Sequence, residues 1–390
     1  MTEIKKFQAD VIYPVVGDPI PNGIIAVDNN GIILEIGKES NFQRNNIKTF
    51  KGCLIPGLIN THCHIELSHM KSVIPTGTGL IPFITTVVQH RGASKTKIKN
   101  AIANAEKEMR KNGIVAVGDI SNTLDSAEIK RKSSLLFHTF VEVFDLLIDS
   151  NAESSLNQYA EIYDKMPGKK SIVPHAPYSV SPTLMKILGS FKQADNVTIS
   201  IHNQETLPEL ELFARKSGEF LSFYEKFGIS LENFNPKEKS SIEHALSYLN
   251  PKYKTLFVHN TLTQDSDIKM AHNWSKKVFW ATCPNANLYI ENRLPNYKIF
   301  LENNAKMTIG TDSLTSNWNL SILDEMKTIS KMQSYVPLDE ILKWATINGA
   351  QALGFEDTIG SLEVGKSPGI NLLSCEKLNF SNAVKIRKII

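Results

Sequence analysis

Two histidines separated by one residue, His62 and His64, close an apolar run that starts at Leu54. Side chains of an extended strand alternate between its two faces, so residues i and i+2 point the same way and can reach one metal ion together. We therefore interpret the pair as half of a metal site at the end of a strand.

Further polar residues end or follow other apolar runs, namely His202 with Glu205, His259, and Asp312. Imidazoles and a carboxylate suit a borderline divalent metal such as Zn²⁺ or Fe²⁺, and three or four protein ligands can leave a position for water. Glu205 comes three residues after His202, just past the expected strand end. Its side chain can reach the same site without binding the metal, and this makes Glu205 the candidate general acid/base.

The composition is that of a soluble globular enzyme. The 390 residues include 42% apolar and 21% charged residues, with 43 Lys and Arg against 40 Asp and Glu. This balance argues against a nucleic acid or an anionic membrane as partner. The four cysteines show no Cys-x-x-Cys spacing and the N-terminus lacks a signal-peptide core, so we expect a cytoplasmic protein. No stretch reaches the apolar length needed to span a bilayer.

The first fifty residues favour a small β unit. Two apolar runs, 24–27 and 32–36, flank the sequence DNNG at 28–31, whose Asn and Gly tolerate the positive φ of a tight hairpin. Beyond residue 54, short apolar runs alternate with amphipathic stretches. Residues 94–112 have helical spacing and stop at Gly113, a plausible C-cap, before the strand-like run 114–119.

Eight candidate strands follow this alternation. Their ends lie near His64, Asp119, Val143, His175, His202, His259, Thr282 and Asp312. Eight strands alternating with helices over about 250 residues predict an α/β fold of the (β/α)8 TIM-barrel type, with catalytic groups at the C-terminal strand ends. We place the barrel at residues 54–355, and residues 1–53 and 356–390 in a small β-sandwich.

Five segments together resemble the amidohydrolase superfamily, in order and over nearly the whole chain. They are PGLINTHCHIELS at 56–68, HAPYSVS at 175–181, HNQET at 202–206, GTDSLTSN at 310–317 and ATINGA at 345–350. The nearest branch resembles deaminases acting on S-adenosylhomocysteine, methylthioadenosine or aminodeoxyfutalosine, which is often grouped with chlorohydrolases. The resemblance implies a (β/α)8 barrel with a sandwich built from both termini, and one divalent metal ion, commonly zinc, held by His62, His64, His202 and Asp312.

On this interpretation three residues are catalytic. Glu205 takes a proton from water activated by the metal ion and passes it to the ring nitrogen of the substrate, while Asp312 and His259 assist the tetrahedral intermediate. His259 alone would more often be a core histidine, and the resemblance favours the functional role. His175 either shapes the turn before Pro177 or binds substrate, as the deaminase analogy suggests.

Two departures from the family pattern concern the substrate. Deaminases of S-adenosylhomocysteine hold the amino-acid end with arginines near the third strand, whereas residues 133–170 contain no Arg. The acidic residue that commonly binds ribose hydroxyls in the loop after the first strand is also missing from residues 76–83. The first departure argues against S-adenosylhomocysteine, and the second weakens the case for a nucleoside.

The sequence thus predicts a metal-dependent aminohydrolase that releases ammonia from an adenosine-like or related aromatic amine. One alternative is hydrolysis of another C–N or C–Cl bond of a heterocycle. A second alternative, from another class, is a non-catalytic barrel used for binding or as a scaffold. A small-molecule substrate is the expected partner, and the sequence leaves a homo-oligomer open.

Overall fold

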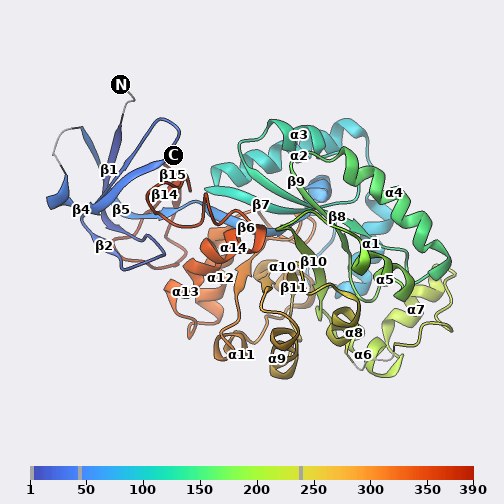
Figure 1. Ribbon diagram of the computed structural model, residues 1–390. Coiled ribbons are helices and arrows are strands. Elements are labelled where there is room, and N and C mark those ends of the chain that lie inside the picture. The colour runs from blue at the N-terminus through green and yellow to red at the C-terminus, as the bar shows by residue number, and fades with distance from the viewer. Residues whose placement is uncertain (1–3, 43–45, 237–239) are drawn as a thin grey trace.

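The computed structural model describes residues 4–42, 46–236 and 240–390. Seven strands from the two ends of the chain form one sheet, in the order β15-β14-β5-β1-β3-β4, with β2 paired to β1 (Figure 1). Their bounds are β1 (Lys5–Ile12), β2 (Ile20–Pro21), β3 (Gly23–Val27), β4 (Ile33–Lys38), β5 (Ile47–Pro56), β14 (Ile370–Leu373) and β15 (Ile386–Lys388). The expected hairpin is confirmed, because β3 and β4 pair antiparallel.

The terminal sheet joins distant parts of the chain. β14 pairs antiparallel with β5, and the Cys53 thiol donates to the carbonyl oxygen of Cys375, 322 residues further along. The predicted boundary at residue 53 falls inside β5, which continues to Pro56. After one glycine, Gly57, the chain enters β6, so the terminal sheet leads directly into the strand that carries His62.

The eight predicted strands are all present and form two parallel four-stranded sheets, β6-β7-β8-β9 and β10-β11-β12-β13. Their bounds are β6 (Leu58–Cys63), β7 (Ile114–Ser121), β8 (Leu136–Val143), β9 (Lys169–Pro174), β10 (Thr198–Asn203), β11 (Lys254–His259), β12 (Val278–Thr282) and β13 (Met307–Ile309). The sheets adjoin at both edges. His202 N donates to His175 O (2.9 Å), and Asp312 N donates to His62 O (3.0 Å).

Helices surround these strands (Figure 1). They are α1 (Leu80–His90), α2 (Lys95–Lys111), α3 (Ala127–Lys132), α4 (Ala152–Lys165), α5 (Pro182–Ser190), α6 (Leu207–Arg215), α7 (Glu219–Lys226), α8 (Ser241–Tyr248), α9 (Asp265–Trp274), α10 (Pro284–Glu291), α11 (Tyr297–Glu302), α12 (Ile322–Met332), α13 (Leu338–Trp344) and α14 (Ile347–Leu353). The predicted helix at 94–112 is α2. It starts at an N-cap, Ser94, whose hydroxyl accepts from Lys97 N, and ends before Gly113 at φ 76°. Within the described residues, no helix has both the length and the apolar character to cross a membrane.

The strands are buried on both sides. All residues of β6, β10 and β12 are buried, which fits parallel strands covered by helices on one face and by one another's side chains on the other. The largest apolar cluster in the described residues extends from these strands to the inner faces of the surrounding helices. This rigid scaffold fixes where the polar residues at the strand ends lie.

Candidate active site

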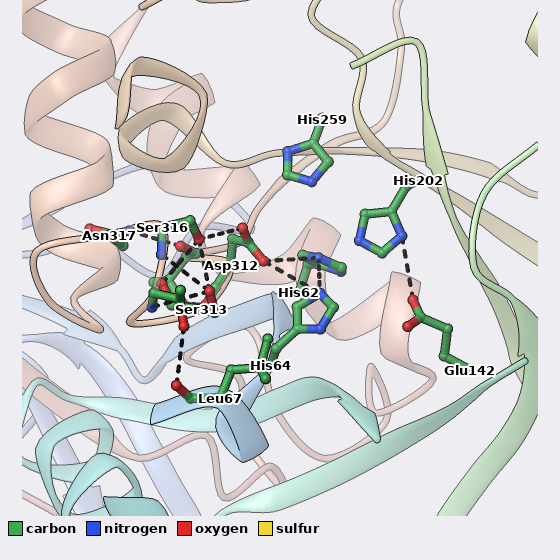
Figure 2. Close-up of polar contacts among 12 residues, drawn as sticks. His62, His64, Leu67, Glu142, His202, His259, Asp312, Ser313, Ser316 and Asn317 are labelled. Atoms are coloured by element: carbon green, nitrogen blue, oxygen red, sulfur yellow. Dashed lines mark hydrogen bonds and ion pairs between the residues drawn. The ribbon is translucent and has the colours of Figure 1, made fainter. Parts of the chain in front are cut away.

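The predicted metal ligands converge at the C-terminal ends of the parallel strands (Figure 2). His62 lies in β6, His64 directly follows it, His202 lies in β10, and Asp312 follows β13. His62 Nε2 lies 3.2 Å from His64 Nε2, and Asp312 Oδ1 lies 3.6 Å and 3.4 Å from these two nitrogens. The His202 ring is centred 4.9 Å from the His62 ring. Residues as far apart as 62 and 312 therefore meet at one point.

These separations fit a small cation. Two ligand atoms about 2.0–2.1 Å from one tetrahedral zinc ion are about 3.3 Å apart, close to the values among His62, His64 and Asp312. A second overlapping group, formed by His62, His202 and His259, offers ring nitrogens within 4.8 Å of one another. Two ring nitrogens facing each other at 3.2 Å satisfy both lone pairs only if a proton or a cation lies between them. The donor set therefore fits a borderline divalent metal.

His202 is oriented by its backbone surroundings. Its Nδ1 donates to the carbonyl oxygen of His175 at 2.8 Å, and Glu142 Oε1 lies 3.4 Å from the same nitrogen. A neutral imidazole with its proton on Nδ1 keeps the Nε2 lone pair for a metal. Figure 2 shows Glu142 on the side of His202 away from Asp312.

Hydrogen bonds also fix the Asp312 side chain and the backbone of the turn after His64. The Ser316 hydroxyl donates to Asp312 Oδ2 at 2.5 Å, which leaves Oδ1 directed toward the histidines. Ile65 N donates to Asp119 Oδ1 at 2.9 Å, and Asp119 Oδ2 is paired with Lys130 at 2.6 Å in the buried interior. The neighbouring strand β7 thus fixes the backbone where the two histidines leave β6.

Burial sets the protonation states that metal binding needs. It lowers the pKa of the His62, His202 and His259 imidazoles and lowers that of His64 to about 4. Burial opposes ionisation of Asp312, yet the His62 contact and the neighbouring imidazoles bring the pKa of this carboxyl well below its usual range. The site therefore presents neutral imidazoles and one carboxylate at neutral pH.

Glu205 lies beside this cluster and is buried. Its Oε1 is 3.6 Å from His259 Nε2, and it belongs to none of the ligand groups found among the described residues. Its backbone N–H donates to Glu209 Oε2 at 3.0 Å, which fixes the turn after β10. Burial raises the pKa of Glu205 well above its ordinary value, and the charges of Asp312 and Glu209 act in the same direction. A carboxyl with a raised pKa is suited to exchanging protons near neutrality.

His259 ends β11 with a defined ring orientation. Its Nδ1 lies 2.8 Å from the side-chain oxygen of Asn287, an acceptor, so Nδ1 carries the proton and Nε2 faces the cluster. Asn287 lies in α10, and its amide orients a candidate catalytic residue.

Three residues next to the cluster have left-handed backbone conformations. Gln204, His259 and Asp312 have φ values of 46°, 72° and 57°. Such conformations cost about 1–3 kcal/mol for residues other than glycine and gather at functional sites. They turn the chain sharply at the strand end, so that Glu205, His259 and Asp312 face the site.

His175 lies at the same end, just after β9. Its Nδ1 is 2.5 Å from the Ser179 hydroxyl, which itself donates to Ala176 O, so the imidazole N–H is on Nδ1. The ring is 4.7 Å from the His202 ring and lines the cavity over the cluster. The loop before α5 therefore orients His175, and its Nε2 remains available for a ligand.

A cavity of about 980 Å³ lies over these groups, and part of this volume is open to solvent. Its polar floor contains His64, His175, His202, Glu205, His259 and Asp312. Its walls are mainly apolar side chains of α1, α7 and the segment after β8. Two charged residues of the lining, Arg91 and Glu142, were not singled out from the sequence. Arg91 lies at the end of a helix, where an arginine usually faces solvent, and Glu142 lies inside a strand expected to be apolar.

A family model and curated relatives match most of the chain. A model described as the amidohydrolase family matches residues 53–388. A curated adenosine deaminase of Helicobacter pylori is 28% identical over 340 residues, covering 85% of this chain and 81% of the relative.

Solved structures show the same fold. The crystal structure of Helicobacter pylori aminofutalosine deaminase in complex with methylthio-coformycin has a TM-score of 0.82 at 22% identity, covering 99% of this chain and all of the other. A zinc-bound adenosine deaminase from Xanthomonas campestris has a TM-score of 0.73 at 19% identity, covering 97% and 86%.

Proposed function

Because the chain belongs to the amidohydrolase family, we propose that it is a metal-dependent deaminase releasing ammonia from an adenosine-like compound. The observation that carries the proposal is the convergence of His62, His64 and Asp312 within 3.6 Å, with Glu205 beside them but outside the ligand groups. The relatives' names supply the substrate type, since the adenosine deaminase matches most of the chain.

In this proposal His62, His64, His202 and Asp312 hold one divalent metal ion, with Zn²⁺ preferred over Fe²⁺. A zinc ion in such a site lowers the pKa of a coordinated water to about 7 and thereby supplies a nucleophile at neutral pH. The zinc bound to the structurally similar deaminase supports the choice of metal.

The chain's own residues then move the protons. Glu205 accepts a proton from the attacking water and delivers it to the ring nitrogen next to the carbon that bears the amino group. Oxygen adds to that carbon, the carbon–nitrogen bond breaks, and the amino group leaves as ammonia after gaining the second proton of the attacking water. Since burial raises the pKa of Glu205, its carboxyl can both take up and release this proton.

Three further residues assist. His259, with its proton fixed on Nδ1 by Asn287, presents Nε2 to the reacting centre, and Asp312 can accept a proton from the attacking water. His175 is proposed to contact the substrate through its Nε2. The apolar cavity walls exclude bulk water and strengthen these interactions.

The scaffold belongs to the same proposal. We take the two four-stranded sheets to form one closed (β/α)8 barrel, supported by the backbone hydrogen bonds at both shared edges. Residues 1–53 and 356–390 form the proposed β-sandwich domain, and residues 54–355 the catalytic domain. A cytoplasmic location is also proposed, supported by four free cysteines.

An ammonia-release screen tests the function. The metal-loaded protein is incubated with adenosine, 5′-deoxyadenosine, 5′-methylthioadenosine, guanine, a pterin and a chlorotriazine. We expect ammonia from one or more of the adenosine-type compounds. Release from guanine alone, or chloride from the triazine without ammonia from any adenosine, would replace the proposal with another hydrolase reaction.

A further inference from the structure

The N-terminus of α1 is capped by a side chain from another helix. Its own N-cap residue is Gly79, at φ 76°, which has no side chain that could accept from the first free N–H groups of the helix. The Leu80 N–H donates instead to Glu291 Oε1 at 2.8 Å. Glu291 is the last residue of α10, so the start of α1 depends on the end of α10.

The same oxygen atom of Glu291 holds the turn that carries Glu205. The Thr206 hydroxyl donates to Glu291 Oε1 at 2.8 Å, and Thr206 directly follows Glu205. Thr206 is also the N-cap residue of α6, where a threonine usually accepts from the N–H groups of its own helix. Its side chain makes no such capping hydrogen bond. The hydroxyl therefore connects the turn to α10 instead of capping α6.

The position of Glu291 is explained by these two contacts and not by α10. A carboxylate at the C-terminus of a helix meets the negative end of the helix dipole, which is unfavourable. The N-termini of α1 and α6 both approach this carboxylate, through Leu80 and Thr206. The positive ends of these two helix dipoles favour a negative charge there.

Backbone hydrogen bonds attach the segment before α1 to the same end of α10. Gly77 N and Gly79 N donate to the carbonyl oxygens of Tyr289 and Ile290, at 2.6 Å and 2.9 Å. These carbonyls belong to the last turn of α10, where carbonyl oxygens have no partner within the helix. The N-terminal end of α1 is thus fixed to α10, and Glu291 extends the attachment to the turn before α6.

Both ends of this attachment reach the cavity. Leu80 and Ile290 line it together with Glu205. Burial raises the pKa of Glu205 and the charge of Glu291 acts in the same direction, so the two carboxyl groups are close enough to interact. Glu291 itself is not among the described residues that line the cavity. It can therefore act on the general acid/base without touching the substrate.

We propose that Glu291 is a positioning residue, which sets the distance between the α1 wall of the cavity and the Glu205 carboxyl by holding Leu80 and Thr206 through one oxygen atom. The inference rests on the proposed deaminase function and adds a residue to it. Proton transfer needs its donor and acceptor at hydrogen-bond distance. A displacement of about 1 Å, even when caused by a change far from the chemistry, can lower a rate about 100-fold.

Two substitutions of Glu291 separate its hydrogen bonds from its charge. Glu291→Gln keeps an oxygen atom that can accept from both donors, whereas Glu291→Leu removes it. The substrate is the adenosine-type compound that releases ammonia fastest. We expect Glu291→Leu to lower kcat per metal-loaded chain about 10- to 100-fold, and Glu291→Gln to recover most of the rate. Glu302→Leu, at the exposed last residue of α11, is the matched control and should behave as wild type.

Thr206 tests the same contact from its other side. Thr206→Val has nearly the same size but cannot donate a hydrogen bond, whereas Thr206→Ser keeps the hydroxyl. We expect Thr206→Val to lower kcat with metal content unchanged, and Thr206→Ser to stay near wild type. If Glu291 only stabilises the fold, Glu291→Leu would melt at a lower temperature, but its folded, metal-loaded protein would keep the wild-type kcat. That result would overturn the proposal.

Hydrogen exchange measured by mass spectrometry tests the link without turnover. In Glu291→Leu we expect faster exchange both in the peptide that contains Leu80 and in the peptide that contains residues 204–206, with wild-type rates in Glu291→Gln. If no compound releases ammonia but both peptides respond, the link stands and the deaminase proposal falls. If ammonia is released but only one peptide responds, or neither does, Glu291 does not join the cavity wall to the general acid/base.

Discussion

Replacing Glu205 by Gln separates proton transfer from metal binding. The amide has nearly the same size and shape as the carboxyl group but cannot accept a proton at neutral pH. Glu205 lies 3.6 Å from His259 and outside the ligand groups of the described residues, so Glu205→Gln should keep the metal ion. We expect turnover to fall while the site stays assembled.

The expected loss of rate follows from the proposed role of Glu205 as a general acid and base. A positioned acid/base contributes about 10²- to 10⁴-fold to the rate, which corresponds to about 3–5 kcal/mol in the activation free energy. The other carboxylates lining the cavity cannot easily replace Glu205, because Asp312 faces the histidines and Glu142 lies against His202 on the other side. Folding should change little, since burial raises the pKa of Glu205 and the metal-free protein already favours its uncharged form.

The assay combines kcat for ammonia release with elemental analysis of the same preparation. Glu219→Gln, an exposed residue of α7, serves as the matched control and should behave as wild type. If Glu205→Gln protein loses its metal, Glu205 is a ligand and the assignment is wrong. If it keeps near wild-type turnover, another group moves the proton.

Three further predictions concern the metal, the packing around it and pH. Wild-type protein should bind about one divalent ion per chain, and two tightly bound ions measured by elemental analysis would contradict this. The His202→Ala variant should lose metal and activity together, because the substitution removes a direct ligand of the metal ion. Gly310→Ala should lower metal occupancy and thermal stability, because the added Cβ would lie 2.8 Å from the Cβ of His62 and 2.9 Å from its carbonyl oxygen; unchanged values in both measurements would show that the strands can move apart. Burial lowers the pKa of His138 in β8 to about 3 in the native protein, whereas its pKa in the unfolded chain is about 6.5. Between these two pH values the unfolded chain binds a proton that the native protein does not bind. The free energy of unfolding should therefore fall as the pH drops from 6.5 toward 3. At about 1.4 kcal/mol per pKa unit, the free energy of unfolding should fall by on the order of 5 kcal/mol over this range. Urea unfolding of His138→Gln at the same pH values should show a smaller dependence of this free energy on pH. The same dependence in both proteins would refute the contribution of His138.

Local patterns were sufficient for much of the scaffold and for placing the proposed ligands at one end of the parallel strands. The strand ends could be placed because each buried strand is a short apolar run that stops at a polar residue, as at His202 and His259. His62 and His64 could be paired because alternation along a strand is a local rule. The ring orientations of these residues needed the structure, since they depend on hydrogen bonds to distant groups such as Asn287.

The residues that the sequence missed are those whose role comes from packing. Arg91 lies 27 positions after His64 on a helix, and its polar character alone predicts a solvated side chain. Its place at the cavity depends on the packing of α1 against α7 and α10, and on the contact between the His69 ring and the Arg91 carbonyl oxygen. Likewise, Glu142 is one acidic residue in a buried strand, and nothing local shows that it lies against His202.

The pairing of β5 with β14 has a consequence for the order in which the protein can be completed during synthesis. Cys53 reaches its partner Cys375 only after 322 more residues have been made, about 16–64 s at ribosomal rates of about 5–20 residues per second. Until then one side of β5 has no neighbour, and an unpaired apolar edge invites association between chains. Because β5 leads through Gly57 into β6, which carries His62, a chain truncated before β14 exposes the unpaired edge of β5 close to the proposed metal ligands. Loss of the last twenty residues, which include β15 and most of β14, should therefore harm solubility more than their small number suggests.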